Sequence, residues 1–284
     1  MILKYGARGD EVVLVQKKLK ELGFKGQTGK PLSTDGIFGE STEFAVIQFQ
    51  KSKGILVDGK VGDKTRAALA GSDVSKLLKD SDYIAAAKRL KVSELTIRVF
   101  GAVEGRGVGF LKNGKAKILF ERHRMYFYLA QFKGKSFASL QAQTCPSIVN
   151  PKTGGYKGNE AEYTRLRLAQ NIHPESALMS CSWGQFQIMG ENWKELGYES
   201  VFDFEKQMQT SESLQLEAFI RFIEWKTGTV GGKKVSLLEA LRAEDWTAVF
   251  TLYNGPNYKK LGYQAKFQKE WDHLEPIYGA KQVA

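Results

Sequence analysis

Two glutamates near the middle of the chain are placed so that they could act as a catalytic pair. Glu104 ends the apolar stretch LTIRVFGAVE and precedes three closely spaced glycines, and Glu121 follows the apolar run ILF. A carboxylic acid that protonates a leaving oxygen, beside a carboxylate that stabilises positive charge or orients water, is the arrangement that cleaves glycosidic bonds. The alternatives are an exposed Glu104 at a frayed helix end and an ion pair of Glu121 with a neighbouring arginine.

The stretch before Glu104 has the apolar spacing of a helix. It predicts a helix that begins near Ser93 and ends at Glu104, with Gly105 as its cap. The partial negative charge of a helix C-terminus and contact with Ile97 and Phe100 would both disfavour an ionised carboxylate. We therefore expect Glu104 to be a proton donor.

A β-hairpin is expected directly after this helix. Residues 109–123 place strand-forming residues on either side of Asn113-Gly114, the preferred pair for a tight hairpin turn. Glu121 would lie on the second strand, with His123 two residues later on the same face. The hairpin would thus carry the second carboxylate close to the first.

Several motifs, in this order, resemble the N-acetylmuramidase domain of bacteriophage endolysins over about residues 80–275. They are Glu104, LFERH (119–123), GGYKGNEAEYTRL (154–166), SWGQFQIMG (182–190) and YNGP (253–256). SWGQFQIM and YNG also resemble signatures of soluble lytic transglycosylases and goose-type lysozymes. Those transglycosylases usually have Ser after the catalytic Glu, whereas this chain has Gly105, which favours hydrolysis.

The resemblance implies a set of site residues. Glu104 would be the catalytic acid, Gln187, Tyr253 and Asn254 would lie along a glycan cleft, and Ser182 and Tyr156 would lie nearby. Amide and hydroxyl groups suit sugar hydroxyls, and aromatic rings suit sugar faces. Tyr253 has a structural alternative, as the last member of a helical stripe.

The first seventy residues contain a duplicated motif, D-G-x-x-G-x-x-T. It occurs in STDGIFGEST (33–42) and LVDGKVGDKT (56–65), where Asp-Gly predicts a tight turn and Thr42 and Thr65 predict helix N-caps. Stripes of apolar residues predict about three short helices; they are Val12, Val15, Leu19 and Leu22, then Thr42, Ala45, Val46 and Phe49. Residues 5–70 resemble the peptidoglycan-binding module of cell-wall hydrolases.

The predicted fold is mainly α: a small three-helix peptidoglycan-binding bundle and a larger lysozyme-like α domain with one β-hairpin. We expect a binding domain over 1–70, a linker over 71–79 and a catalytic domain over 80–284. Later helices are predicted by apolar stripes and a capping box; these are Leu216, Phe219, Ile220 and Ile223, then Ser236 with Glu239, then Trp246, Val249, Phe250 and Tyr253, stopped by NGP (254–256).

Composition narrows the partners. The net charge is +11 over 284 residues, which suits an anionic bacterial envelope. The sequence contains no run of five basic residues, and this weakens the case for nucleic-acid binding. The three histidines lack metal-ligand spacing, so we expect neither metal nor cofactor. Cys145 and Cys181 could form at most one disulfide, and free thiols are the expectation.

No apolar stretch approaches the length of a membrane span, so we expect no membrane insertion. We expect a monomer that waits in the host cytoplasm until a separate pore-forming factor releases it. The preferred function is hydrolysis of the β-1,4 bond between N-acetylmuramic acid and N-acetylglucosamine. A lytic transglycosylase and a non-catalytic wall-binding protein are the alternatives, and retaining and inverting paths both stay open.

Overall fold

The computed structural model describes residues 2–105, 107–255, 258–260 and 262–279. The chain forms two compact units, one of residues 1–100 with 267–284 and one of residues 101–266. Helices dominate both units, as predicted from the apolar stripes. Two helices, α5 (Glu94–Glu104) and α14 (Tyr263–Tyr278), contribute residues to both units.

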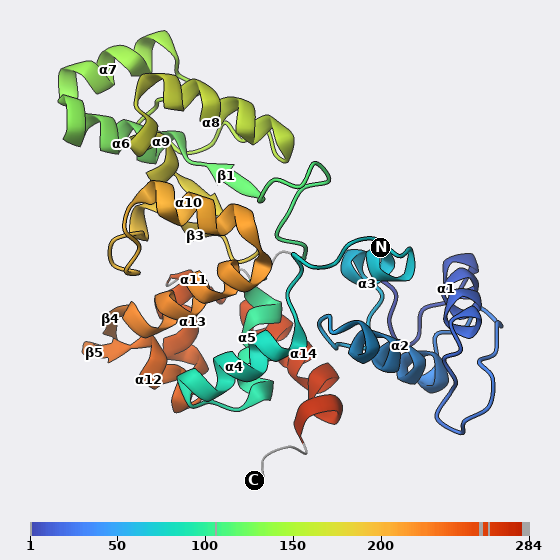
Figure 1. Ribbon diagram of the computed structural model, residues 1–284. Helices are drawn as coiled ribbons and strands as arrows, with labels where there is room; N and C mark the ends of the chain where they lie inside the picture. The colour runs from blue at the N-terminus through green and yellow to red at the C-terminus, as the bar shows by residue number, and fades with distance from the viewer. Residues whose placement is uncertain (1, 106, 256–257, 261, 280–284) are drawn as a thin grey trace. The chain divides into compact units, whose positions relative to one another are not determined.

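Three short helices surround the core at the start of the first unit. They are α1 (Asp10–Glu21), α2 (Glu40–Lys53) and α3 (Asp63–Leu69), coloured blue to cyan in Figure 1. Their core holds Val12, Val15 and Leu19, as predicted. The prediction for Leu22 was wrong: α1 ends at Glu21, so Leu22 lies in the following turn and is 44% exposed.

The two threonines of the duplicated motif are not N-caps, contrary to the prediction. Gly39 and Gly62 occupy those positions, and each threonine lies inside its helix. A buried glutamine supplies the reason. Gln16 Nε2 donates to Thr42 Oγ1 (3.0 Å), and Gln50 Nε2 donates to Thr65 Oγ1 (3.1 Å).

Each of these glutamines also closes the Asp-Gly turn of its repeat. Gln16 Oε1 accepts from Gly36 N at 2.9 Å, and Gln50 Oε1 accepts from Gly59 N at 3.0 Å. Buried amides need such partners on both their oxygen and their nitrogen. The motif is therefore built around a buried glutamine that the pattern D-G-x-x-G-x-x-T does not contain.

The aspartates of the two motif copies differ in environment. Hydrogen bonds from Ile37 N and then Gln16 Nε2 lower the pKa of Asp35. Burial raises the pKa of Asp58, and α14 covers that copy: His273 Nε2 donates to Asp58 O at 2.6 Å. The second copy is thus also a structural contact for the C-terminal helix.

The predicted linker residues are part of the first unit. Leu78 is fully buried, and Lys79 bridges to Ile55 just before α4 (Asp80–Leu90) begins. The two compact units are defined by how residues pack. The predicted boundaries at residues 70 and 80 instead separate a domain that binds peptidoglycan from a domain that cleaves it. Those boundaries stay a prediction.

The second unit contains the remaining helices and all the strands. Its helices are α6 (Arg122–Lys133), α7 (Lys135–Thr144), α8 (Glu160–Ile172), α9 (Pro174–Met179), the 3₁₀ helix η1 (Gly190–Asn192), α10 (Val201–Thr210), α11 (Glu212–Trp225), α12 (Leu237–Arg242) and α13 (Trp246–Asn254). The stripe predicted in α11 is buried, and Ser236 caps α12 as predicted. Pro256 of the predicted NGP stop lies outside the described residues.

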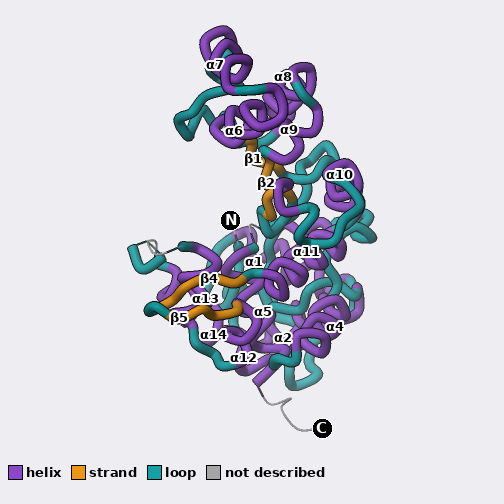
Figure 2. The backbone as a smooth tube through the Cα atoms, turned by 90° about the vertical axis from the view of Figure 1, so that its left-hand side faces the viewer, coloured by secondary structure: helices purple, strands orange, loops and turns teal. Residues whose placement is uncertain are grey.

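The predicted hairpin over 109–123 forms only around its turn, over residues 109–117, and its continuation was predicted wrongly. The Phe110–Ala116 bridge closes the Asn113-Gly114 turn, and Lys117 N donates to Gly109 O and Leu111 N to Lys115 O, both at 2.8 Å. The strand β1 (Ile118–Phe120) pairs instead with β2 (Cys181–Trp183), which pairs with β3 (Ile188–Met189); the sheet is orange in Figure 2. Residues 111–115 are largely polar and exposed, whereas Ile118 and Phe120 are buried, so the core selects β2 as the partner.

A further hairpin of this unit was not predicted. Strands β4 (Thr227–Val230) and β5 (Lys233–Ser236) pair antiparallel between α11 and α12. Because β1 ends at Phe120, Glu121 is not a strand residue; it is the N-cap of α6, and His123 lies within that helix. The expected shared strand face of Glu121 and His123 is thus corrected.

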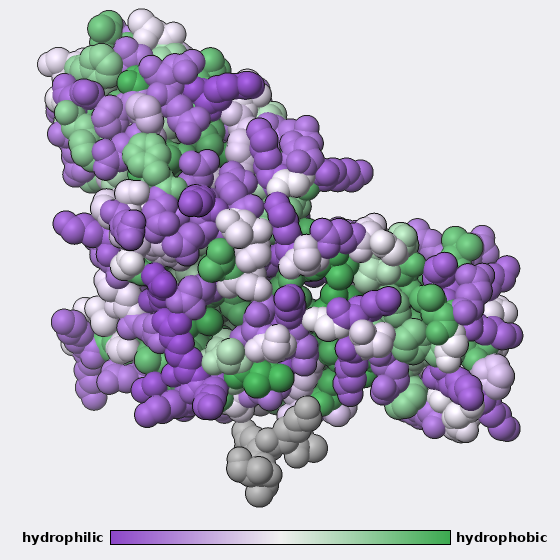
Figure 3. Space-filling model, in the orientation of Figure 1, coloured by the Kyte–Doolittle hydropathy of each residue, from purple (hydrophilic) through white to green (hydrophobic). Residues whose placement is uncertain are grey.

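The face of the molecule drawn in Figure 3 is mostly hydrophilic, with local apolar patches. Exposed hydrophobic side chains on α6, α7 and α8 include Phe127, Phe132, Phe137, Leu140 and Leu168, in the region where Figure 3 shows hydrophobic patches. No helix within the described ranges is both long and apolar enough to cross a bilayer.

Candidate active site

Helix α5 is surrounded by protein before it reaches Glu104. Residues 95–101 are all buried, so this segment lacks the polar face of an ordinary surface helix. The helix ends at Glu104, as predicted, and Gly105 N donates to Gly101 O at 2.8 Å. Glu104 is itself only 9% exposed. A buried helix therefore fixes the position of this carboxyl group.

The glycines after Glu104 are required by close packing and by backbone conformation. A Cβ on Gly105 would lie 2.8 Å from Gln185 Nε2, and Gly107 has a φ of +70°. Gly109 approaches the buried Gln215 amide, and its N–H donates to Glu212 Oε1 at 2.6 Å. A side chain would not fit at Gly105 or Gly109 and would strain the backbone at Gly107, so these glycines let the chain turn away behind the acid.

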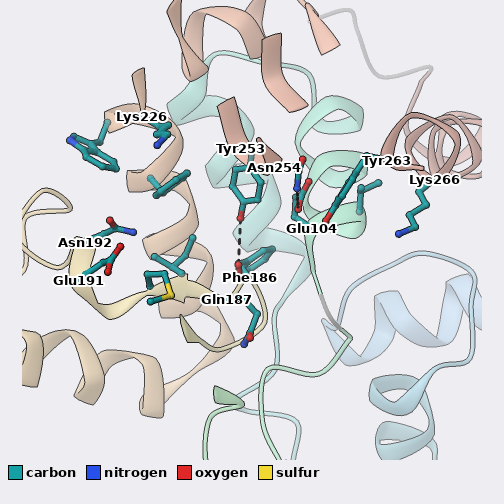
Figure 4. A pocket seen from close by; sticks show the side chains of 15 residues that line it. Glu104, Phe186, Gln187, Glu191, Asn192, Lys226, Tyr253, Asn254, Tyr263 and Lys266 are labelled. Carbon is teal, nitrogen blue, oxygen red and sulfur yellow. Dashed lines mark hydrogen bonds between the residues drawn. The ribbon is translucent and has the colours of Figure 1, made fainter. Parts of the chain in front are cut away.

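A pocket of about 560 Å³ opens at the end of α5. Its lining combines apolar, amide, aromatic and charged side chains: Val103, Glu104, Phe186, Gln187, Ile188, Met189, Glu191, Asn192, Phe222, Trp225, Lys226, Tyr253, Asn254, Tyr263 and Lys266 (Figure 4). All of these residues belong to the second unit. A concave site with a few polar groups on an apolar wall is the usual form of a ligand site.

Asn254 holds the carboxyl group of Glu104. Its Nδ2 donates to Glu104 Oε2 at 3.1 Å, from the last residue of α13 (Figure 4). The preceding Tyr253 also lines the pocket, and its OH donates to Phe186 O at 3.4 Å. Its ring packs against Phe219 and Phe222 with centroids 5.7 and 5.5 Å away, so Tyr253 is both a stripe residue and a pocket residue.

Gln187 lines the same pocket in an unusual backbone conformation. Its φ is +53°, which is rare for a residue with a side chain and marks a constrained position. Ser182 Oγ donates to its Oε1 at 3.0 Å, and its Nε2 donates to Gly184 O at 2.9 Å. Ser182 is therefore connected to the pocket through Gln187, although it is not itself a lining residue.

Glu121 and Tyr156 form a separate pair. Tyr156 OH donates to Glu121 Oε2 at 2.8 Å, and His123 Nδ1 lies 3.2 Å from the same oxygen. Burial, followed by the hydrogen bond to Glu121, raises the pKa of Tyr156. Neither Glu121 nor Tyr156 lines the Glu104 pocket. The pocket thus unites four of the predicted residues, Glu104, Gln187, Tyr253 and Asn254, and not these two.

Glu121 does not form the alternative ion pair with Arg122 or Arg124. Arg122 donates to backbone carbonyls, including Thr153 O at 2.8 Å. Arg124 Nε donates instead to Glu191 Oε2 at 2.6 Å. Glu121 is left to Tyr156 and His123.

Sequence reasoning missed three charged residues of the pocket, Glu191, Lys226 and Lys266. Glu191 directly follows the quoted motif SWGQFQIMG, and that adjacency was the available signal. It accepts from Tyr128 OH at 2.9 Å as well as from Arg124, and burial, then Glu191, raises the pKa of Tyr128 to about 12. Lys226 and Lys266 had no motif to indicate them.

Comparison with known proteins identifies the family. Residues 95–275 match the N-acetylmuramidase family, and residues 8–69 match a peptidoglycan-binding domain family. The chain belongs to the N-acetylmuramidase family. The predicted modular organisation, enzyme class and lysozyme-like fold of an endolysin are confirmed at the level of family.

A solved structure resembles nearly the whole muramidase-family chain. The endolysin of Burkholderia AP3 phage shares 38% identity with a TM-score of 0.84, over 97% of this chain and 100% of that one. The spore cortex-lytic enzymes of Halalkalibacterium halodurans and Bacillus cereus share 40% and 41% identity over 68 residues, which are 24% of this chain. The match spans only 19% and 24% of those curated relatives, so it concerns a module.

Proposed function

We propose that this chain is an endolysin that hydrolyses the β-1,4 bond between N-acetylmuramic acid and N-acetylglucosamine, with Glu104 as the general acid. The observation that supports this most is a buried carboxyl group at the end of α5, bonded to Asn254 in the wall of a pocket. A general acid must lie within hydrogen-bond reach of the oxygen that it protonates, and a pocket wall allows this approach.

Two features of the Glu104 position favour the form that can donate a proton, against the single N–H that Asn254 donates to Oε2. Burial and the partial negative charge at the end of α5 both disfavour the ionised carboxylate. Glu104 gives its proton to the glycosidic oxygen as the bond to the anomeric carbon breaks, and the leaving sugar departs as an alcohol. Water then adds to the anomeric carbon, and its surplus proton restores the acid.

We assign the proton transfer to Glu104 and give Glu121 a structural role. The Glu121 carboxylate is bonded to Tyr156 outside the residues that line the pocket. Glu191 does line the pocket, but it is paired with Arg124, so we regard it as an ion partner. Gln187, Tyr253 and Asn254 would position the glycan, with Ser182 acting through Gln187.

The remaining proposals concern the whole protein. Residues 1–70 would hold the enzyme on peptidoglycan, residues 71–79 would link the two domains, and residues 80–284 would cleave the glycan. Binding by the first domain would raise the local concentration of substrate at the second. The protein would act as a monomer without nucleic acid, wait in the host cytoplasm for a pore-forming factor, and then cause lysis. Its charge of +11 suits the anionic envelope and predicts a salt-sensitive rate.

The test is the clearing of purified sacculi by wild type and by Glu104→Gln, with co-sedimentation measured in parallel. The substitution keeps the shape and removes the proton, so we expect binding without clearing. Retained clearing by Glu104→Gln would remove Glu104 from the mechanism. Wild-type protein that sediments with sacculi but never clears them would favour a non-catalytic wall-binding protein.

A further inference from the structure

Two lysines line the pocket, each beside an aromatic ring. Lys226 directly follows α11, and its Nζ lies 5.7 Å from the ring centre of Trp225. Lys266 lies on α14, with its Nζ 5.1 Å from the ring centre of Tyr263. Figure 4 shows the two lysines toward opposite ends of the pocket, with Glu104 between them.

The positive charges of these lysines are available to a ligand. Within the described part of the chain, no carboxylate forms an ion pair with Lys226 or Lys266. Glu191, in the same lining, is already held by Arg124 and Tyr128. The pocket thus keeps one carboxylate paired and two ammonium groups open.

A neutral glycan would not need such groups. Hydroxyl and N-acetyl groups are bound well by amides, hydroxyls and aromatic faces, all of which the pocket offers. An ammonium group adds most when its partner is a carboxylate, because charge-assisted hydrogen bonds are the stronger ones. The lysines therefore indicate an anionic substrate.

The geometry points to a specificity device: we propose that Lys226 and Lys266 bind carboxylates carried on the lactyl side of muramic acid, so that the cleft selects acidic peptidoglycan over neutral glycan. This inference rests on the proposed cleavage of peptidoglycan. The lactyl group of muramic acid carries either a free carboxylate or a stem peptide that has carboxylates of its own. N-acetylglucosamine has no such group. Muramic acid occupies alternate sugars, so carboxylates recur on both sides of the bond cut at Glu104.

Trp225 and Tyr263 fit the same role. Each ring could cover the face of a sugar while the adjacent lysine reaches the acidic substituent of that sugar or its neighbour. An ordinary attraction between a basic protein and an acidic polymer would need no such placement. It would depend on net charge alone.

A matched set of variants separates these two explanations. Lys226→Met and Lys266→Met remove charges from the pocket, and Lys234→Met removes the same charge from exposed β5, away from the lining. On intact sacculi we expect kcat/KM to fall about fivefold for each pocket variant, as for the loss of one solvent-exposed ion pair, and less than about twofold for Lys234→Met. Lys226→Arg and Lys266→Arg should restore most of the loss.

The substrate is then changed instead of the protein. Wild-type enzyme is assayed on sacculi whose carboxylates have been converted to neutral amides, and we expect a drop of about tenfold or more. Strands stripped of peptide by an amidase keep only the lactyl carboxylate. A pocket-variant defect on stripped strands assigns the lactyl group as the ligand, and a defect seen only on intact sacculi assigns the stem peptide.

The proposal is overturned if the pocket variants match Lys234→Met, or if wild type cleaves the neutralised substrate as fast as the native one. The second result does not depend on any variant folding. Wild-type enzyme that cuts no form of peptidoglycan would instead refute the proposed function, and this inference with it.

Discussion

Glu104 and Glu121 have the same type of side chain, but the pocket at Glu104 and the region around Glu121 are different environments. Glu104 is 9% exposed, ends a buried helix and is bonded to Asn254 in a lined pocket. Glu121 is the N-cap of α6, its side chain is 16% exposed, and it accepts a hydrogen bond from the more exposed Tyr156. Residue type and sequence spacing predicted the two acids as a pair. Both side chains are largely buried, so the pocket distinguishes them: Glu104 lines it and Glu121 does not. We expect chemistry from the first region and stability from the second.

The largest expected effect is on Glu104. Glu104→Gln should lower kcat by about a hundredfold to ten-thousandfold, the usual contribution of a general acid, with little change in thermal stability. The measurement is the initial rate of reducing-end release from sacculi, beside a melting curve. A loss of less than about tenfold in a folded variant would refute the distinction between the two regions.

Asn254→Ala should give the next largest loss. It removes the amide that donates to Glu104 Oε2 and leaves the buried carboxyl group without that bond. We expect kcat to fall about tenfold, equivalent to about 1.4 kcal/mol of barrier. Asn171→Ala, an exposed change on α8, is the matched control and should leave the rate unchanged. Equal rates for both variants would contradict a positioning role of Asn254.

Glu121→Gln should have a small effect on the rate. The glutamine can still accept from Tyr156, so we expect kcat within about threefold of wild type and an unfolding free energy lowered by less than about 1 kcal/mol. The same rate assay, combined with urea denaturation, checks both expectations. A loss as large as that of Glu104→Gln would restore Glu121 as the second catalytic carboxylate.

The smallest effect lies at His173, in the same region as Glu121. His173 Nδ1 accepts from Ser176 N and caps α9, and burial, then Lys133, lowers the pKa of His173. The folded state therefore binds fewer protons than the unfolded state, and stability should fall as the pH drops through about 6.5, the ordinary histidine value. We expect a change below about 1 kcal/mol, measured by urea denaturation above and below that pH.

His173→Asn is the control for this pH dependence. Asparagine is a good N-cap without a titrating group, so the variant should lose this part of the pH dependence and keep its catalytic rate at neutral pH. An unchanged pH slope would show that His173 is not its source.

The sequence predicted those parts of the site that are determined by residues close together along the chain. The apolar stretch before Glu104 located the end of α5, and the motifs around Gln187 and Asn254 located two further segments of the pocket. Each of these follows from helical spacing or from a contiguous motif. Neighbouring residues along the chain were sufficient to find them.

Sequence did not predict features that depend on distant partners. Glu121 was misplaced because β1 pairs with β2, about sixty residues further on, rather than across the Asn113-Gly114 turn. Local spacing predicts a cap at Thr42, whereas its actual bond to Gln16 joins separate helices. Lys226 and Lys266 come to the pocket from different elements, and no local pattern marks either one.

The most direct test of the central claim is mass spectrometry of the muropeptides released in water enriched in heavy oxygen. Hydrolysis with Glu104 as the acid predicts reducing muramic acid ends that carry the heavy isotope, and no such products from Glu104→Gln. Anhydro ends without the isotope would show that the sugar's own hydroxyl, and not water, attacks. Labelled reducing ends from Glu104→Gln at the wild-type rate would contradict the assignment of Glu104.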